Sequence, residues 1–258
     1  MTTITTSTEG LVEGAVDVPA SDRTLPAYRA MPSGGRALPT ILVVQEIFGV
    51  HPWIRDVCRR FARLGYYAIA PDLYVRQGDP SKIADTQTLI RDIVAKVPDE
   101  QVLRDLDATV AYAQSTGDAD TSRLGITGFC WGGRIVWMYA AHDSRVKAAV
   151  AWYGPVARVY HEGDRTPLDV VQNIGAAVLG LYGGADPGIP VESTRRIGDE
   201  MRKAGKTVEI VTYPEAPHAF FADYRASYRK EAAEDGWRRM LDWFRQHEVQ
   251  APGVVGLR

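Results

Sequence analysis

The stretch Ile126-Thr127-Gly128-Phe129-Cys130-Trp131-Gly132-Gly133 places a cysteine between two glycines in the spacing Gly-x-Cys-x-Gly. An apolar run, residues 123–127, leads into it, and a helix-like run, residues 134–141, leaves it. Glycines on both sides let the chain reverse sharply between a strand and a helix while the middle side chain projects from the turn. Turns of this kind usually carry a nucleophilic serine. The pattern therefore predicts that Cys130 is a catalytic thiol.

Apolar runs and helical patterns alternate on both sides of this turn. Runs at residues 40–44 and 66–70 predict strands that are buried on both faces, as in a parallel sheet. Runs at residues 146–152, 176–182 and 207–213 predict further strands. Helical spacing of apolar residues predicts helices at residues 52–64, 81–97, 99–115, 191–204 and 228–247, with Asp99 as an N-cap after the break at Pro98. The alternation predicts one doubly wound α/β domain over residues 11–248 with a mostly parallel sheet.

The two ends of the chain depart from this alternation. Residues 11–18 and 25–31 alternate between apolar and polar, which predicts an antiparallel hairpin at a sheet edge with its turn at residues 19–22. Residues 1–10 are rich in threonine and are predicted to be loose, and residues 249–258 are predicted to form a tail.

Composition narrows the class of partner. The 258 residues carry a net charge of −2 with both signs interspersed, so no basic block favours nucleic acid and no basic amphipathic segment favours a membrane surface. The first ten residues lack the apolar core of a signal peptide. Two cysteines do not make a disulfide framework. We expect a cytoplasmic protein, a monomer or small homo-oligomer, acting on a small molecule.

Five of the loops that follow predicted strands each contain a polar or reactive side chain. These side chains are Glu46, Arg76, Cys130, Asp186 and His218. In a parallel sheet the loops after the carboxyl ends of the strands share one edge, and ligands bind there. The five side chains are therefore expected to converge, and this convergence is stronger evidence than any single motif.

The residues at this edge suit nucleophilic catalysis. A thiol attacks a carbonyl as the thiolate and needs a base nearby, and a histidine base needs a carboxylate on its other ring nitrogen. Cys130, Asp186 and His218 follow the chain order nucleophile, acid, histidine that is expected on this kind of fold. The backbone N–H groups of Trp131 and Ile47 are the expected donors to the oxyanion. No metal-ligand spacing or phosphate-binding loop is present, so no metal or organic cofactor is expected.

Several motifs together resemble the dienelactone hydrolase (carboxymethylenebutenolidase) family. The matching segments, in order over roughly residues 40–245, are residues 45–50 (QEIFGV), 71–74 (PDLY), 128–133 (GFCWGG), 153–154 (YG) and 217–220 (PHAF). The resemblance implies an α/β-hydrolase fold, a Cys-His-Asp triad and hydrolysis of an enol-lactone ester. It also implies that Glu46 contacts the resting thiol and helps to form the thiolate, since a carboxylate is a poor neighbour for a thiolate and a good acceptor from a thiol.

The resemblance also implies that arginines hold the carboxylate of an anionic substrate. Arg76 matches one such position. The second family position matches Ala222, and Arg225 is displaced from it. Tyr153 and Phe220 are further candidates for the substrate pocket. Because alanine replaces the second family arginine at position 222, the sequence predicts the catalytic chemistry more firmly than the substrate.

Other interpretations remain open at this point. One is a broad-specificity carboxylesterase or thioesterase of the same fold, and another is a catalytically inactive α/β-hydrolase that binds a ligand or partner. Cys58 lies on an apolar helical face and is expected in the core. His247 is the competing base, but it lies in a charged run, which favours His218. His51 follows the Glu46 loop and is expected to have a structural or solvent-exposed role.

Overall fold

A computed structural model describes residues 3–251, and its strands form one eight-stranded sheet in the order β1-β2-β4-β3-β5-β6-β7-β8. The strands are β1 (Leu11–Pro19), β2 (Thr24–Pro32), β3 (Leu38–Val44), β4 (Tyr67–Pro71), β5 (Ala119–Phe129), β6 (Val146–Trp152), β7 (Ala177–Gly183) and β8 (Val208–Tyr213). β1 and β2 form the antiparallel edge, β2 pairs antiparallel with β4, and every other neighbouring pair is parallel. The predicted α/β fold with an antiparallel N-terminal edge is confirmed.

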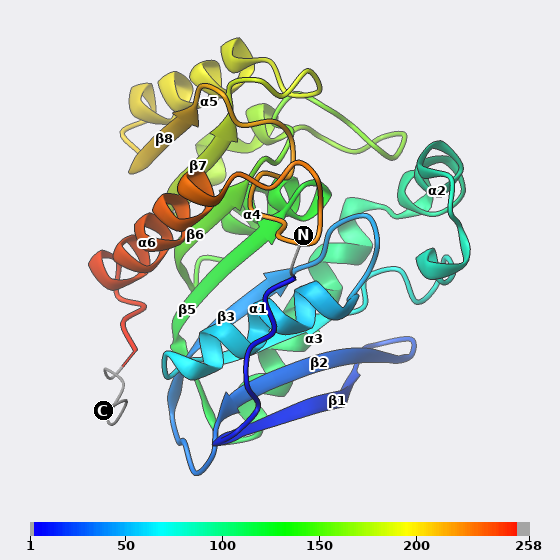
Figure 1. Ribbon diagram of the computed structural model, residues 1–258, viewed down its shortest axis with the longest axis vertical. Coiled ribbons are helices and arrows are strands. Elements are labelled where there is room, and N and C mark those ends of the chain that lie inside the picture. Colours follow the sequence, from blue (N-terminus) through cyan, green and yellow to red (C-terminus); the bar gives the residue numbers. More distant parts are fainter. Residues whose placement is uncertain (1–2, 252–258) are drawn as a thin grey trace.

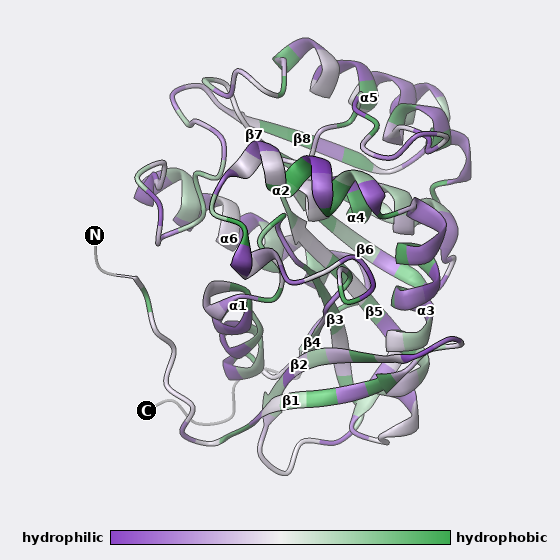
Figure 2. Cartoon of the chain, turned by 90° about the vertical axis from the view of Figure 1, so that its right-hand side faces the viewer, coloured by the Kyte–Doolittle hydropathy of each residue, from purple (hydrophilic) through white to green (hydrophobic). Residues whose placement is uncertain are grey.

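Helices cover both faces of this sheet. α1 (Pro52–Arg63) and α6 (Lys230–Gln246) lie on one side, and α3 (Asp99–Ser115), α4 (Trp131–His142) and α5 (Val191–Lys203) lie on the other (Figure 2). Every residue of β3, β4 and β7 is buried, which explains why their sequences are continuous apolar runs instead of alternating ones. The arrangement is the doubly wound one that the sequence predicts.

The prediction of one helix over residues 81–97 is wrong. The chain there forms three short pieces, η1 (Pro80–Lys82), α2 (Thr86–Asp92) and η2 (Val94–Lys96). Two aspartates start separate helices, because the side chain of Asp79 accepts from the N–H of Ser81 and that of Asp85 accepts from the N–H of Thr88. Between them Ile83 is extended, at φ −116° and ψ 104°. Another short helix, η3 (Pro167–Asn173), lies where the sequence predicts no element.

Asp99 does not cap α3 as predicted. Pro98 is the N-cap, and Asp99 is the first helical residue. Its carboxylate instead accepts two hydrogen bonds of 2.6 Å from the fully buried guanidinium of Arg134, on α4. A buried arginine needs such a bidentate partner, and this tertiary demand takes the carboxylate away from the helix end.

The segments next to the chain ends are held by the fold. Residues 3–10 were expected to be loose, but the N–H of Thr6 donates to Asp56 Oδ1 on α1 over 2.7 Å, and this segment runs across α1 (Figure 1). Val249 is buried, and its carbonyl accepts a hydrogen bond from Tyr66. Residues 252–258 of the predicted tail lie outside the described residues.

Gly154→Ala is expected to destabilise the protein. A Cβ at Gly154 would come closer than 3.0 Å to the backbone of Gly133 and Arg134, where α4 meets the end of β6. Overpacking of this kind costs about 1–3 kcal/mol, which lowers Tm by roughly 2–10 °C in a chain of this size. Thermal unfolding followed by circular dichroism measures the effect. Gly175→Ala is the matched control, because a Cβ there meets no atom within 4 Å; equal Tm values for the two variants would contradict the prediction.

Candidate active site

Cys130 stands at the apex of the turn between β5 and α4, as predicted. Its backbone has φ 57° and ψ −120°, a conformation that is unfavourable for a residue with a Cβ. The turn is held on both sides, because the N–H of Cys130 donates to the carbonyl of Trp152 over 3.0 Å and its carbonyl accepts from the N–H of Arg134 over 3.2 Å. Strain of about 1–3 kcal/mol persists at a residue only where its surroundings fix it. The thiol is therefore presented by a rigid turn.

The glycines of the motif are required by close backbone contacts. A Cβ at Gly128 would come closer than 3.0 Å to the carbonyl of Gly132. A Cβ at Gly132 would likewise meet the carbonyl oxygens of Val44 and Gln45. The first turn of α4 therefore packs directly on the end of β3, which brings the loop after β3 beside the thiol.

Asp186 and His218 meet in the loops after β7 and β8. His218 Nδ1 lies 2.6 Å from Asp186 Oδ2, and the carboxylate side chain is 2% exposed. The other carboxylate oxygen accepts the N–H of Gly188 over 2.8 Å. With Nδ1 engaged by the carboxylate, Nε2 is the ring nitrogen left for a substrate or a thiol.

Glycines also explain how these two loops come together. A Cβ at Gly183 would come closer than 3.0 Å to the carbonyl of Ala216, and one at Gly184 would do the same at Pro214. The N–H of Ala185 donates to the carbonyl of Ala216 over 3.1 Å. Parallel pairing of β7 with β8 continues past the strand ends in this way, and the two loops are fixed side by side.

The surroundings of His218 favour its protonated form. Burial opposes the charge on the imidazole, but the hydrogen bond that His218 donates to Asp186 and the neighbouring sulfur of Cys130 outweigh burial and raise the pKa of His218 to about 10. Asp186 contacts Nδ1 of the ring, and Cys130 is close enough to influence its protonation. An imidazolium here would stabilise a thiolate and could protonate a leaving group.

The two predicted oxyanion donors belong to neighbouring segments. The N–H of Trp131 is in the first turn of α4, where backbone N–H groups have no partner within the helix. Ile47 lies in the bend that follows β3, which is closed by a hydrogen bond from the N–H of Gly49 to the carbonyl of Glu46 over 3.3 Å. Because Gly132 packs on Gln45, the two segments lie side by side at the turn that carries Cys130. Their role as oxyanion donors stays a prediction.

Glu46 is buried at the start of the bend after β3 and has two partners that the sequence did not identify. Its Oε2 lies 3.2 Å from His51 Nε2 and accepts the hydroxyl of Tyr224 over 2.7 Å, while Oε1 is buried with no hydrogen-bond partner among the described residues. Burial alone would raise the pKa of Glu46, but His51, Tyr224 and the charge of Arg225 lower it below the ordinary value. These partners favour the carboxylate form of Glu46. No hydrogen bond joins it to the Cys130 thiol in residues 3–251, so the predicted contact with the thiol stays a prediction.

The two candidate arginines lie in different surroundings. Arg76 forms ion pairs with Asp22 and with the buried Asp105, each at 2.6 Å. Arg225 lies over the rings of Phe48 and Tyr224, with its guanidinium carbon 5.3 and 5.8 Å from their centres. Among residues 3–251, no carboxylate forms an ion pair with Arg225. Of the two arginines, Arg225 is the one with charge available to a ligand.

Tyr153 and Phe220, the other pocket candidates, are both fully buried. Tyr153 has a positive φ of 39°, and its ring lies edge-on to that of His218 at 5.2 Å. Its hydroxyl is buried without a partner in the described chain, and burial with the nearby charges of Glu46 and Cys130 raises its pKa well above the ordinary value. Phe220 packs behind it, 5.5 Å away. Tyr153 therefore lines the site and has a hydroxyl that could bond to a ligand, and Phe220 packs behind it.

The remaining histidines and cysteine do not compete for the catalytic position. His247 lies at the end of α6, with its ring 4.3 Å from that of Trp243. Cys58 is fully buried on α1, as predicted, and burial raises the pKa of its thiol. His51 is more than the structural residue expected, since it holds Glu46. Its position five residues after Glu46 was visible in the sequence, but the contact with Tyr224 depends on the tertiary fold.

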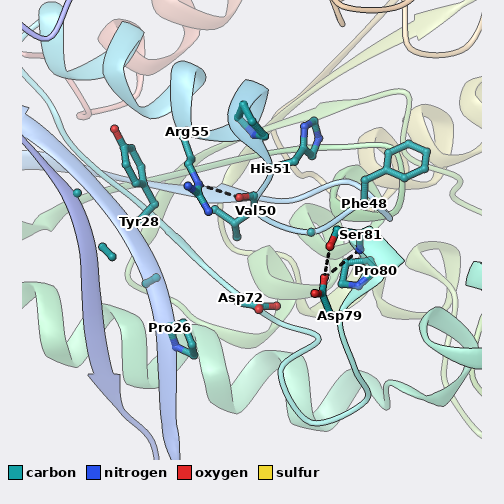
Figure 3. Close-up of a pocket in the computed structure, with 15 residues that line it drawn as sticks. Pro26, Tyr28, Phe48, Val50, His51, Arg55, Asp72, Asp79, Pro80 and Ser81 are labelled. Carbon is teal, nitrogen blue, oxygen red and sulfur yellow. Dashed lines mark hydrogen bonds between the residues drawn. The ribbon is translucent and has the colours of Figure 1, made fainter. Parts of the chain in front are cut away.

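A cavity of about 610 Å³ is lined in part by Phe48 and His51, from the loop that carries Glu46. Figure 3 shows Phe48 and His51 at one end of this cavity and Tyr28 and Arg55 at the other. Residues of the N-terminal hairpin, among them Ala15 and Pro26, form part of its wall. His51 therefore contacts Glu46 and also borders the cavity.

Residues 3–251 lack two further kinds of feature. No group of three or more histidine, cysteine, aspartate or glutamate residues there is arranged to hold a metal ion. No helix in this part of the chain has both the length and the apolar character needed to cross a membrane.

A doubly wound sheet with a cysteine on the strand–helix turn, and an Asp–His pair after the last two strands, defines an α/β hydrolase. Comparison with known proteins narrows the class. The sequence matches the dienelactone hydrolase family over residues 25–248. The chain belongs to this family and is a hydrolase of the dienelactone hydrolase, or carboxymethylenebutenolidase, type.

Individual relatives agree with this assignment. A protein of Methylorubrum extorquens named "Putative carboxymethylenebutenolidase" is 59% identical over 254 residues, which cover 96% of this chain and 86% of that protein. The crystal structure of a "Putative Dienelactone Hydrolase" from Klebsiella pneumoniae has 52% identity and a TM-score of 0.89, and the match covers 92% of this chain and 99% of that one. A Bradyrhizobium protein named "Probable 2-oxo-3-(5-oxofuran-2-ylidene)propanoate lactonase" is 30% identical over 93% of this chain and 97% of its own.

Proposed function

We propose that the protein hydrolyses lactones and related carboxylic esters through a thioester on Cys130. The observation that carries the proposal is the 2.6 Å contact between His218 Nδ1 and the buried Asp186, formed at the same edge of the sheet as the strained turn that presents the Cys130 thiol. The three residues have the chain order and the roles of a nucleophile, a base and an orienting acid.

The geometry supports a two-step reaction. The Cys130 thiolate attacks the carbonyl carbon, and the negative oxygen that forms is stabilised by the N–H groups of Ile47 and Trp131. The carbon–oxygen bond to the leaving group then breaks, and that oxygen takes the proton of the His218 imidazolium. Neutral His218 next removes a proton from water, whose oxygen attacks the thioester. The carbon–sulfur bond breaks, and the acid product leaves with the thiolate restored.

Arg225 favours a substrate that carries a carboxylate. Its guanidinium is held between Phe48 and Tyr224 beside the site and forms no ion pair with the carboxylates of residues 3–251. The Bradyrhizobium relative is named for a lactone with a propanoate group. Arg76, in contrast, is paired with Asp22 and Asp105, so we assign recognition of the substrate anion to Arg225.

A broad-specificity carboxylesterase is the second candidate. Ala222 stands where the family resemblance places an arginine, and Arg76 is already neutralised by two aspartates. An enzyme that binds the substrate carboxylate with one arginine would prefer anionic over neutral substrates less strongly than an enzyme with two. Rates on neutral esters would then approach those on anionic lactones.

The covalent intermediate is the direct test of the proposed function. Rapid quenching of the enzyme with an excess of an activated aryl ester at low pH should give an intact mass that is larger by one acyl group. Peptide mapping should place the acyl group on Cys130. An acyl group on another residue, or steady turnover without any acyl-enzyme, would overturn the thioester mechanism.

Arg225→Ala is expected to reduce selectivity for anionic substrates. A charge-assisted hydrogen bond contributes about 1.5–3 kcal/mol, so kcat/KM for a carboxylate-bearing lactone should fall roughly tenfold or more. The value for the same lactone without the carboxylate should change much less. Arg104→Ala is the control, because Arg104 forms an exposed ion pair with Glu100 on α3. An equal loss on both lactones would show that Arg225 does not read the carboxylate.

A further inference from the structure

We propose that His51 and Tyr224 are positioning residues that clamp one oxygen of Glu46, so that its other oxygen, Oε1, accepts the proton of the Cys130 thiol. The inference rests on the proposed function of Cys130 and assigns to two further side chains the task of holding Glu46. Neither side chain touches the reacting atoms in this scheme, and both act through the carboxylate.

The strand register places Glu46 and Cys130 side by side. β3 and β5 are parallel neighbours, with Val44 paired to Gly128. Each chain runs on for two residues past this pair, to Glu46 on one side and to Cys130 on the other. The close packing of Gly132 on the carbonyl of Gln45 keeps the two segments together beyond the end of the sheet.

The two oxygens of the Glu46 carboxylate are in unequal surroundings. Oε2 is in contact with both His51 Nε2, at 3.2 Å, and the Tyr224 hydroxyl, at 2.7 Å. Oε1 is buried and has no partner among the described residues, although the Glu46 side chain is only 1% exposed. An unpaired buried carboxylate oxygen is unfavourable, and a thiol is a suitable donor to it.

The clamp is built from two loops that are far apart in the sequence. His51 belongs to the loop after β3, and Tyr224 to the segment that follows His218. Their rings pack edge-on at 5.3 Å, and Trp53 lies against both, with ring centres 6.2 Å from His51 and 5.8 Å from Tyr224. Arg225 adds a positive charge next to Tyr224. These contacts fix the orientation of the carboxylate.

The titratable groups near Glu46 determine where the proton of the Cys130 thiol can go. The charges of Glu46 and Cys130 both act on the Tyr153 hydroxyl, and Cys130 also acts on His218, so these four groups lie close together. The Tyr153 hydroxyl remains protonated because its pKa is raised well above the ordinary value by burial and by the charges of Glu46 and Cys130. When the thiol ionises, the S–H bond breaks, the electron pair stays on sulfur, and the proton moves to Oε1. The proton returns to sulfur once the product has left.

Reactivity of Cys130 toward iodoacetamide, measured against pH, tests the clamp without relying on turnover. The variants are Tyr224→Phe, His51→Ala and His51→Gln, with Tyr228→Phe as the matched control, because Tyr228 makes no side-chain hydrogen bond to Glu46. Fully buried Cys58 should not react under native conditions, and peptide mapping assigns the label. Thermal unfolding checks that each variant is folded.

We expect Tyr224→Phe and His51→Ala to move the midpoint of alkylation to higher pH and to lower kcat about tenfold, with KM changed less than twofold. His51→Gln should restore part of the loss, since an amide can also donate to Oε2. In a Glu46→Gln enzyme, neither Tyr224→Phe nor His51→Ala should cause these changes in alkylation and kcat. An alkylation profile that is unchanged in both clamp variants would overturn the proposal. A Cys130→Ala enzyme that keeps its activity would instead refute the proposed function, whatever the alkylation profiles show.

Discussion

Cys130→Ala is expected to lower kcat/KM for an activated carboxylic ester by about 10⁴-fold or more, the scale seen when a catalytic nucleophile is removed from a triad. Alanine deletes the sulfur and leaves the turn backbone intact, because Cys130 is fixed by backbone hydrogen bonds to Trp152 and Arg134. The loss should appear in kcat, and no acyl-enzyme should form. Initial rates on an aryl ester, at substrate concentrations above and below KM, separate the two constants.

Cys58→Ala is the matched control for this experiment. Cys58 is the other cysteine of the chain, is fully buried on α1 and lies outside the site. Its substitution should leave kcat/KM within a fewfold of the original value while lowering the stability slightly. Full esterase activity in Cys130→Ala would contradict the nucleophilic role, and equal losses in both variants would indicate general destabilisation.

The sequence allowed the frame of this protein to be predicted because its elements are strongly periodic. A fully buried strand such as β7 (Ala177–Gly183) appears as an unbroken apolar run, and the predicted and observed bounds of β6 (Val146–Trp152) coincide. The Gly-x-Cys-x-Gly spacing located the turn because two glycines there are required by backbone contact. Asp186 and His218 followed from the rule that loops after parallel strands share one edge.

Other features could not be predicted because they depend on partners that are distant in the sequence. Asp99 looked like a helix cap, but a buried arginine thirty-five residues later takes its carboxylate. Arg76 fits a family position, yet Asp22 and Asp105 neutralise it. The partners of Glu46 include a tyrosine separated from it by 178 residues. Periodicity and motif spacing carry no information about which side chains will pair across the fold.

Asp186→Asn is expected to lower kcat by about 10⁴-fold, as the equivalent change does in other triads by favouring the wrong imidazole tautomer. Asp186 accepts from His218 Nδ1 over 2.6 Å, and an amide in its place can present a donor to the same nitrogen. The ring would then carry its proton on Nε2, where it cannot act as a base toward water. Asp199→Asn is the control, since Asp199 forms an exposed ion pair on α5.

The same substitution should change the pH dependence of the protein. The pKa of His218 is raised to about 10, so the imidazolium persists in the folded state up to that pH, whereas an unfolded histidine loses its proton near pH 6.5. The stabilisation from this pair is therefore complete below about pH 6.5 and is lost as the pH rises toward about 10. Without the Asp186 charge, the pKa of His218 should fall. Urea unfolding and the iodoacetamide reactivity of Cys130 should be measured between pH 6 and pH 10. Both should differ between the original protein and Asp186→Asn at pH 6, and this difference should shrink as the pH rises. A difference that stays constant over this range would mean that Asp186 does not hold the proton on His218, and the imidazolium would then have to be stabilised by the sulfur of Cys130 alone.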